Sequence, residues 1–292
     1  MNAFLVSHNG LGDNLYMIGA LRFLIKFYKN VYFLCKKKYY ENIKLFFIDT
    51  QNIICIPFDE NKERNSIINI LNEASINLYN DIFVCGMFMK NSFNTRISNK
   101  EFINNIFLEK PKTNFNDYKI DYDTLTSQNY SFIEHFYKDI GMDLSIFYNY
   151  YKIPETQESL ELYNKIKDFY IIFIQLKSSC GKSLNISKLI KKYINDEKSI
   201  LICNDVNLYI DYIKQNNLSG HEIKNFSNKI ELCENFKYNK LVNYYHTIIN
   251  SNEIYIIDSC FIGIVLPLLK QNKLKANTVR IILRDIASQI QL

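Results

Sequence analysis

The residues best placed to do chemistry near the start of the chain are His8, Asn9 and the segment Gly10–Asn14. Two glycines one residue apart let the backbone turn tightly and let a ligand approach the peptide groups. A helical pattern follows, and its first turn would offer free N–H groups and a positive dipole end. Asp13 could act there as a base or cap the helix. A dinucleotide-binding fingerprint is incomplete, because Leu15 stands where the third glycine of G-x-G-x-x-G belongs.

A second candidate is the junction Ile254–Gly263, where an apolar run ends in an acidic and a hydroxyl residue. Asp258, Ser259 and Cys260 stand directly after the run, and a helical pattern over Phe261–Leu269 follows. Such a junction directs backbone N–H groups and the Ser259 hydroxyl toward an anion. The alternative is that Asp258 is a helix N-cap and nothing more.

The third candidate, Gln175–Ser183, follows the strongest apolar run of the chain. Its Gly-Lys-Ser ending is typical of a phosphate-binding P-loop, but Leu176 stands where the first glycine of that motif belongs. A nucleoside-triphosphate hydrolase is therefore excluded. Lys177, Ser178 and Lys182 could still bind a phosphate, and the alternative is that the lysines are solvated surface charges.

The sequence gives little sign of a metal site. The D-x-D at 121–123 lies outside the clear strand and helix pattern, and we interpret it as a chance match. The four histidines form no H-x-x-x-H pair, and the seven cysteines form no C-x-x-C pair. We therefore expect no bound metal, and free thiols in a reducing compartment.

The elements that must position these segments alternate along the chain. Short β-branched or aromatic runs are followed by amphipathic helical stretches, which predicts an α/β protein with parallel sheets and crossover helices. We expect two tandem Rossmann-like parallel-sheet domains, residues 1–153 and 154–292, with any active site in the cleft between them. Ligands of such sheets bind beyond the carboxyl ends of the strands. The pattern also predicts one first helix over 14–28 and a weak strand over 222–226.

The composition limits the function. Apolar residues make up 48% of the 292 residues, which excludes a disordered chain. The net charge of +5 is far from the clustered basicity of a nucleic-acid binder. The N-terminus does not resemble a signal peptide, and no apolar stretch is long enough to span a membrane, so we expect a cytoplasmic protein. Abundant Ile, Asn, Lys, Tyr and Phe indicate an AT-rich genome.

Two of the candidate segments resemble those of a known family. Gly10-x-Gly12-Asp13, followed by Gly19-Ala20-Leu21-Arg22, resembles the N-terminal signature of the heptosyltransferase-like glycosyltransferases of family 9, which have the GT-B fold. Asp258 and Ser259 resemble the Asp-Thr/Ser-Gly motif with which that family holds the donor diphosphate. The chain departs from the family at Cys260, in place of glycine, and around Ile264, in place of histidine. It also resembles glycosyltransferase-like proteins of large AT-rich DNA viruses.

The resemblance implies a metal-independent, inverting glycosyltransferase that moves a sugar from a nucleotide-sugar donor to a glycan or other hydroxyl acceptor. It places the acceptor on residues 1–153 and the donor on residues 154–292, with Asp13 as the catalytic base that deprotonates the acceptor hydroxyl. The implied acceptor-side residues are His8, Asn9, Gly10, Gly12 and Asn14. The implied donor-side residues are Lys177, Ser178, Lys182, Asp258, Ser259 and Cys260.

Two other functions stay open. A non-catalytic GT-B-like protein that binds a glycan or a partner would fit the departures at Cys260 and Ile264. A nucleotide-sugar epimerase on the same fold would need further acid–base pairs and would convert its nucleotide-sugar without an acceptor.

Overall fold

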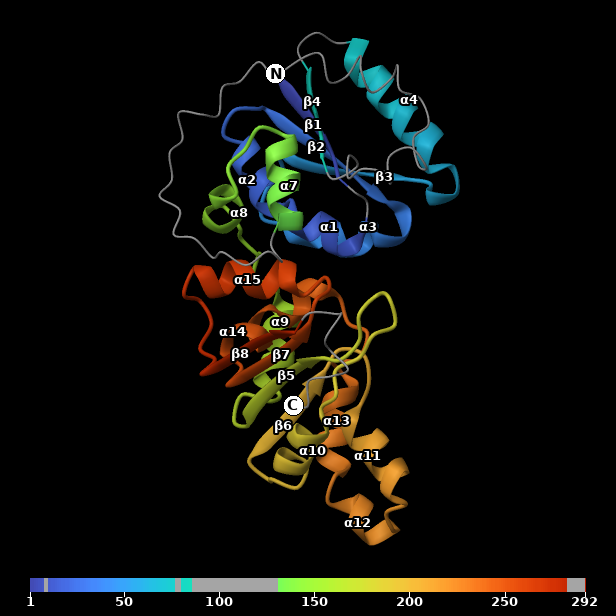
Figure 1. The fold of residues 1–292 in the computed structure, drawn as a ribbon, viewed down its shortest axis with the longest axis vertical. Helices are drawn as coiled ribbons and strands as arrows, with labels where there is room; N and C mark the ends of the chain where they lie inside the picture. Colours follow the sequence, from blue (N-terminus) through green and yellow to red (C-terminus); the bar gives the residue numbers. More distant parts are fainter. Residues whose placement is uncertain (8–9, 77–79, 86–130, 283–291) are drawn as a thin grey trace. The chain divides into compact units, whose positions relative to one another are not determined.

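The computed structural model describes residues 1–7, 10–76, 80–85, 131–282 and 292. The chain divides into two compact units, Met1–Pro154 and Glu155–Leu292. Each unit contains one four-stranded, wholly parallel sheet with helices between the strands (Figure 1). The prediction of an α/β fold with two Rossmann-like parallel sheets is confirmed.

The sheet of unit 1 has the strand order β3-β2-β1-β4. Its strands are β1 (Asn2–Val6), β2 (Asn30–Lys36), β3 (Ile53–Phe58) and β4 (Asn80–Val84). Because β1 pairs with β2 on one side and β4 on the other, the direction of winding reverses between β1 and β4. Ligands of open α/β sheets bind at such a switch point, beyond the carboxyl ends of the strands.

Short helices surround this sheet. They are α1 (Leu11–Tyr16), α2 (Ile18–Leu24), α3 (Tyr40–Ile43), α4 (Glu63–Ile76), α7 (Ser131–Asp139) and α8 (Ser145–Asn149), with 3-10 turns η1 (Lys37–Tyr39), η2 (Lys44–Phe47) and η3 (Glu60–Lys62). Ile67 and Leu71 of α4 pack in one apolar cluster with Val6, Leu34 and Val84. The burial of this cluster fixes α4 against the sheet.

The single first helix expected over 14–28 is divided at Met17, and it begins at Leu11. The fully buried hydroxyl of Tyr137, on α7, donates to the carbonyl of Tyr16 at 2.8 Å and accepts from the amide of Ala20 at 3.2 Å. In an uninterrupted helix those two main-chain groups would bond to each other. A side chain inserted into the ladder is a recognised cause of a helix break.

A close contact fixes α2 against α8. A Cβ atom added to Gly19 would lie 2.8 Å from Ile146 O, Phe147 Cα and Phe147 O. Those atoms are main chain and cannot move aside cheaply, so only glycine allows the two helices to approach this closely. The Gly19 of the family-like signature therefore has a packing reason in this chain.

We predict that Tyr137→Phe destabilises unit 1. Loss of the hydroxyl leaves the buried Tyr16 carbonyl and Ala20 amide without their partner, at a cost of about 1–3 kcal/mol. Urea unfolding would measure the change. Tyr150→Phe is the matched control, because the Tyr150 hydroxyl only accepts an exposed bond from Lys26 at 3.3 Å. Equal urea midpoints for Tyr137→Phe and Tyr150→Phe would show that the Tyr137 hydroxyl does not stabilise unit 1.

The sheet of unit 2 has the order β6-β5-β7-β8. Its strands are β5 (Tyr170–Gln175), β6 (Ser199–Cys203), β7 (Glu253–Ile257) and β8 (Thr278–Ile282). All residues of β6 and β7 are buried. The winding reverses between β5 and β7, so a switch point lies between their carboxyl ends.

Unit 2 has a helix where the sequence predicted a weak strand. The helices of unit 2 are α9 (Gln157–Asn164), α10 (Ser187–Tyr193), α11 (Leu208–Asn216), α12 (Gly220–Lys224), α13 (Ser227–Glu234), α14 (Tyr245–Asn250) and α15 (Ile262–Lys270), with the 3-10 turn η6 (Leu241–Tyr244). The weak strand expected over 222–226 is wrong, because α12 occupies that segment and Ile223 N bonds to Ser219 O at 2.9 Å. Glu and Lys favour the helix there, and no long apolar run opposes it.

A buried carboxylate holds the amino end of β7. Glu253 is 6% exposed and accepts hydrogen bonds from three phenols, Tyr193 at 2.5 Å, Tyr255 at 2.7 Å and Tyr170 at 3.1 Å. Burial alone would raise the pKa of Glu253, but these bonds and the Lys192 charge lower it below its ordinary value. The ionised carboxylate therefore ties β5, α10 and β7 together.

We predict that unit 2 loses stability as the pH falls. A carboxyl with a lowered pKa in the folded state stabilises fully above its unfolded pKa, and loses that contribution as the pH drops through the folded pKa. Glu253→Gln should cost about 1–3 kcal/mol at neutral pH and flatten the acid limb of the stability curve. Urea unfolding between neutral and acid pH tests this, with exposed Glu161→Gln as the control. If the free energy of unfolding fell equally with pH in the wild type and in Glu253→Gln, the stabilising role of the Glu253 carboxylate would be contradicted.

Among the described residues, no helix combines the length and the apolar character needed to cross a membrane.

Candidate functional site

The loop after β1 contains the predicted base. Gly10 is the N-cap of α1 with extended backbone, and its amide donates to the Asp13 carboxylate at 2.9 Å. Asp13 therefore stands at the third position of the helix and reaches back to the cap, as the acidic member of a capping box does. A Cβ on Gly10 would overlap the Asp13 carboxylate. Gly10 is therefore required for this contact. Gly12, the other glycine of the motif, lies inside the first turn of α1.

Asn14 faces inward. Its side chain is fully buried and accepts from the Ser7 hydroxyl at 2.9 Å, while its Nδ2 has no partner among the described residues. Asn14 therefore joins α1 to the end of β1, and the structure does not expose it to a substrate. His8 and Asn9 lie outside the described residues, as do residues 86–130, which include the D-x-D at 121–123.

Asp13 lies at the switch point of unit 1. Burial raises the pKa of the Cys85 thiol, directly after β4, well above its ordinary value, and the charges of Asp139 and Asp13 add to the shift. The Cys85 amide donates to Val6 O, at the end of β1, at 2.9 Å. The Asp13 carboxylate thus stands near the carboxyl ends of both strands that flank the reversal in winding.

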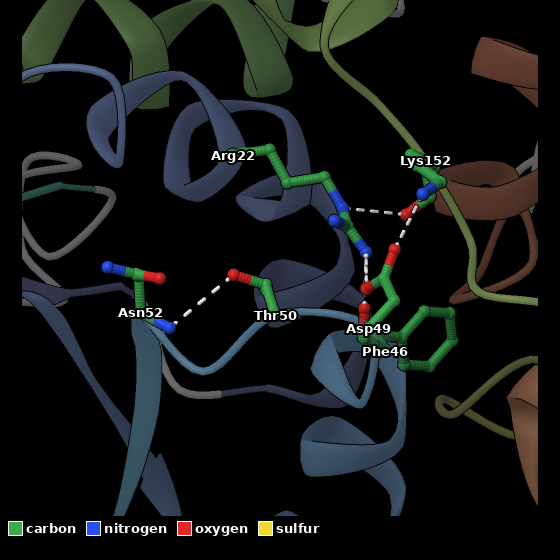
Figure 2. A network of polar contacts seen from close by, with 6 residues as sticks. All are labelled: Arg22, Phe46, Asp49, Thr50, Asn52 and Lys152. Carbon is green, nitrogen blue, oxygen red and sulfur yellow. Dashed lines mark hydrogen bonds and ion pairs between the residues drawn. The ribbon is translucent and has the colours of Figure 1, made fainter.

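Arg22, from the family-like signature, has a structural role (Figure 2). Its guanidinium donates to Phe46 O at 2.8 Å, to Asp49 Oδ1 at 2.7 Å and to Lys152 O at 2.9 Å. Lys152 Nζ also pairs with Asp49 Oδ2 at 2.7 Å. Burial acts to raise the pKa of Asp49, but the bonds from the two cations lower it overall. The arginine therefore ties α2 to the turn after η2 and to the last residues of unit 1.

The loop after β5 closes on itself. Lys177 and Ser183 form an antiparallel bridge, Ser178 N donates to Lys182 O at 2.9 Å, and Gly181 occupies the left-handed region at φ +82°. This hairpin differs from a P-loop, which runs directly into its helix. Lys177 and Lys182 are exposed. Ser178 is buried, and its hydroxyl is used within the loop, donating to Lys182 O at 3.2 Å.

The structure of the loop after β7 contradicts the alternative that Asp258 is only a helix N-cap. Helix α15 begins at Ile262 with Phe261 as N-cap, so Asp258 does not cap it. Ile262 N bonds to Ser259 O at 3.1 Å and Gly263 N to Cys260 O at 3.0 Å, which gives a tight turn from Ser259 into the helix. Asp258 N continues the β7–β8 ladder by donating to Ile282 O at 2.8 Å.

Cys260 fits where the family has glycine. The described residues other than glycine with positive φ are Asn217, Tyr238 and Asn272, so the backbone at Cys260 does not require a glycine. Burial and the nearby Asp205 charge raise the pKa of the Cys260 thiol to about 11, with the Ser259 hydroxyl acting in the opposite direction. The neutral thiol is therefore the favoured form of Cys260 at physiological pH.

Asp205 is a site residue that sequence reasoning missed. It follows β6, and its carboxylate accepts from Lys177 N at 2.9 Å and from Asn204 Nδ2 at 3.0 Å. Burial raises its pKa, and the amide bonds from Lys177 and Leu176 partly offset that rise. Asp205 thus links the end of β6 to the loop after β5. The position directly after an apolar run, which drew attention to Asp258, would have identified it too.

Tyr238 is the second missed residue. Its side chain is 77% exposed, and its backbone has φ +56°, an uncommon and strained conformation for a bulky residue. Its amide donates to Asn204 O, after β6, at 2.9 Å. The neighbouring Asn239 is fixed by bonds to Tyr244 and Asn243. Hydrogen bonds at Tyr238 and Asn239 therefore hold the strained backbone, and the exposed ring stands beside the end of β6.

Parallel pairing brings these unit 2 groups to one edge of the sheet. Gln175 lies opposite Ile256, and Ile174 lies opposite Cys203, so the loops after β5, β6 and β7 begin at the same level. Polar atoms at all three ends are buried without a hydrogen-bond partner in the described part of the chain: Gln175 Oε1, Asn204 Oδ1 and Ser259 Oγ. Buried polar atoms are rarely left unpaired, which indicates a place for water or a ligand. The described residues contain no cluster of three potential metal ligands.

We predict an energetic coupling between Gly10 and Asp13. Gly10→Ala should force the Asp13 carboxylate away and cost about 0.5–2 kcal/mol, a range typical of lost caps. In an Asp13→Ala background the same substitution should cost almost nothing, because the overlapping group is gone. A double-mutant cycle by urea unfolding measures the coupling. Additive effects of the two substitutions would show that the contact is not made in solution.

No family model and no curated protein matches the sequence. Solved structures do match. The chain superposes on the ADP-heptose lipopolysaccharide heptosyltransferase II of E. coli with a TM-score of 0.55 at 10% identity, covering 100% of this chain and 95% of that one. It superposes on a glycosyl transferase of family 9 from Veillonella parvula with a TM-score of 0.52 at 12% identity, covering 91% and 77%. The chain has the two-domain, GT-B-like fold of the heptosyltransferase-like glycosyltransferases.

Proposed function

We propose that this protein is an inverting glycosyltransferase that uses a nucleotide-sugar donor and no metal ion. The observation that carries the proposal is the edge of the unit 2 sheet, where the loops after β5, β6 and β7 converge at the switch point. Two lysines, the amides of a strand-to-helix turn and unpaired polar atoms meet there, which suits a diphosphate. The GT-B-like fold supports the same function by analogy alone.

The leaving diphosphate is stabilised by fixed protein groups in this proposal. Lys177 and Lys182 supply positive charge from the loop after β5, and Asp205 keeps that loop in place through the Lys177 amide. The turn at Ser259 and Cys260 supplies backbone donors and a hydroxyl. Donors and charges that are already oriented stabilise developing negative charge without reorganisation, so they can replace a metal cation.

Tyr238 provides a surface for the base of the nucleotide. A tyrosine side chain has few rotatable bonds to fix on binding, and the exposed face of Tyr238 can stack on a heterocycle. The Asp205 charge acts on the Tyr244 phenol, which accepts from the amide of Asn239 beside Tyr238 at 3.2 Å, so Tyr238 belongs to this edge of the sheet. The left-handed backbone is consistent with a functional role, because such strain is often kept at binding sites.

Asp13 accepts the proton of the acceptor hydroxyl. A base for this step must be ionised when the acceptor binds. The bond from the Gly10 amide favours the ionised carboxylate, and so does the first turn of α1. Inversion follows from a direct attack of the deprotonated acceptor oxygen on the anomeric carbon as the nucleoside diphosphate leaves. Unit 1 is thus the acceptor side and unit 2 the donor side.

We predict that the protein binds nucleoside diphosphates and that Asp13→Asn abolishes transfer without weakening that binding. A saturating nucleoside diphosphate should raise the melting temperature, because a ligand at about 100 times its Kd adds roughly 2.7 kcal/mol. Lys182→Ala and Tyr238→Ala should reduce the shift, while the exposed Lys191→Ala on α10 should not. Asp13→Asn should keep the shift and lower sugar transfer by about 10²–10⁴-fold.

The same experiment separates the other functions. Conversion of a nucleotide-sugar without any acceptor would favour an epimerase. Binding of a glycan with no response to any nucleoside diphosphate would favour a non-catalytic protein and contradict the donor site. Wild-type transfer by Asp13→Asn would contradict the assignment of the base alone.

A further inference from the structure

Unit 2 contains a cavity that the proposed transferase does not use. It has a volume of about 610 Å³, within the range of small-molecule sites. The residues that line it are Phe169, Ile194, Asn195, Glu197, Tyr212, Leu218, Asn225, Phe226, Asn228 and Lys229. They come from the segments before β5 and before β6, and from α11 and the α12–α13 region (Figure 1).

This cavity lies at the opposite edge of the sheet from the donor loops. Phe169 directly precedes β5, and Ile194–Glu197 precedes β6, whereas the donor loops follow those strands. Strand β5 has six residues, so the two edges are separated by about 17 Å along the strand. A ligand in this cavity would not occupy the donor site.

The feature that requires explanation is Lys229. It is only 8% exposed, yet its ammonium makes no ion pair with a described carboxylate. Its Nζ donates to the carbonyl of Asp196 at 2.6 Å and lies 5.6 Å from the centre of the Tyr209 ring. An ammonium has three donors, and among the described residues this bond uses one of them. Burial lowers the pKa of Lys229, and the negative charge of Asp196 offsets only part of that shift.

The rest of the lining suits an organic body. Ile194 and Phe226 are 1% and 6% exposed, and Phe226 meets Tyr212 edge to face at 6.0 Å. Phe169 and Leu218 extend this apolar wall, and the amides of Asn195, Asn225 and Asn228 supply neutral donors and acceptors. Apolar and polar residues line the cavity in equal number, so an aromatic and aliphatic wall stands beside groups that can fix the orientation of a ligand.

Glu197 limits the charge of the ligand. Its carboxylate lines the same cavity, is exposed, and acts electrostatically on Lys229. The Asp196 carboxylate also acts on Lys229, so two negative charges accompany the one positive charge and would repel the extra negative charge of a polyphosphate. This arrangement permits one anionic group at Lys229 and an apolar remainder against the aromatic wall.

We propose that this cavity binds a small organic monoanion, a carboxylate with an apolar or aromatic body, whose charge is paired with Lys229. The anion supplies acceptors for the other donors of the ammonium, and the aromatic wall covers the remainder of the molecule. The site is independent of sugar transfer and would be occupied with the donor site filled or empty.

Fluorine NMR with 4-fluorobenzoate and its neutral analogue 4-fluorobenzamide tests this on the full chain. The benzoate should bind at least about tenfold more tightly than the benzamide, since hydrogen bonds to a charged group carry the difference. Lys229→Met should remove that preference while keeping the stem of the side chain. Lys198→Met is the matched control, because Lys198 is exposed, lies next to Glu197 and does not line the cavity.

A second variant keeps the test decisive if Lys229→Met fails to fold. Leu218→Trp places a large ring in the open cavity and should abolish the binding of both probes with Lys229 intact. The proposal is overturned if wild type binds neither probe at millimolar concentration, or binds both equally. It is also overturned if Lys229→Met keeps the preference, or if Lys198→Met loses it to the same extent.

Discussion

The parallel pairing of β5 with β6 on one side and β7 on the other is the constraint on which the candidate donor site depends. Parallel strands end at the same edge of a sheet, so residues far apart in the chain become neighbours, as Lys177 and Asp205 do across 28 positions. The Asp205 carboxylate then reaches the Lys177 amide, and its charge reaches Cys260. Without this pairing the lysines, the acidic residues and the exposed tyrosine would be unrelated surface groups.

Unit 1 shows how a family-like signature can arise from packing. Gly19 permits the contact between α2 and α8, and Arg22 connects three segments through main-chain carbonyls and Asp49. Gly10 leaves room for the Asp13 carboxylate at the cap. These residues would be retained for the fold alone, and Asp13 is the member of the signature whose substitution separates catalysis from architecture.

The sequence predicted the strands and the three loops well, because buried parallel strands are continuous apolar runs and each loop follows one directly. It did not predict the break at Met17, which is caused by a hydroxyl from Tyr137, 117 residues beyond Ala20. It also missed Tyr238, whose conformation depends on a bond to Asn204 rather than on a local glycine. Contacts distant in sequence leave no local pattern, so only the folded chain reveals them.

The hairpin after β5 also has an experimental use. Cys180, near its tip, is the exposed thiol among the described cysteines. Burial raises the pKa of Cys35 and Cys55 to about 12 and of Cys203 and Cys260 to about 11. Thiol reagents attack the thiolate, so they discriminate strongly against buried groups of this kind. A maleimide dye would therefore attach at Cys180 without engineering, two residues from Lys182, and report directly on events at that loop.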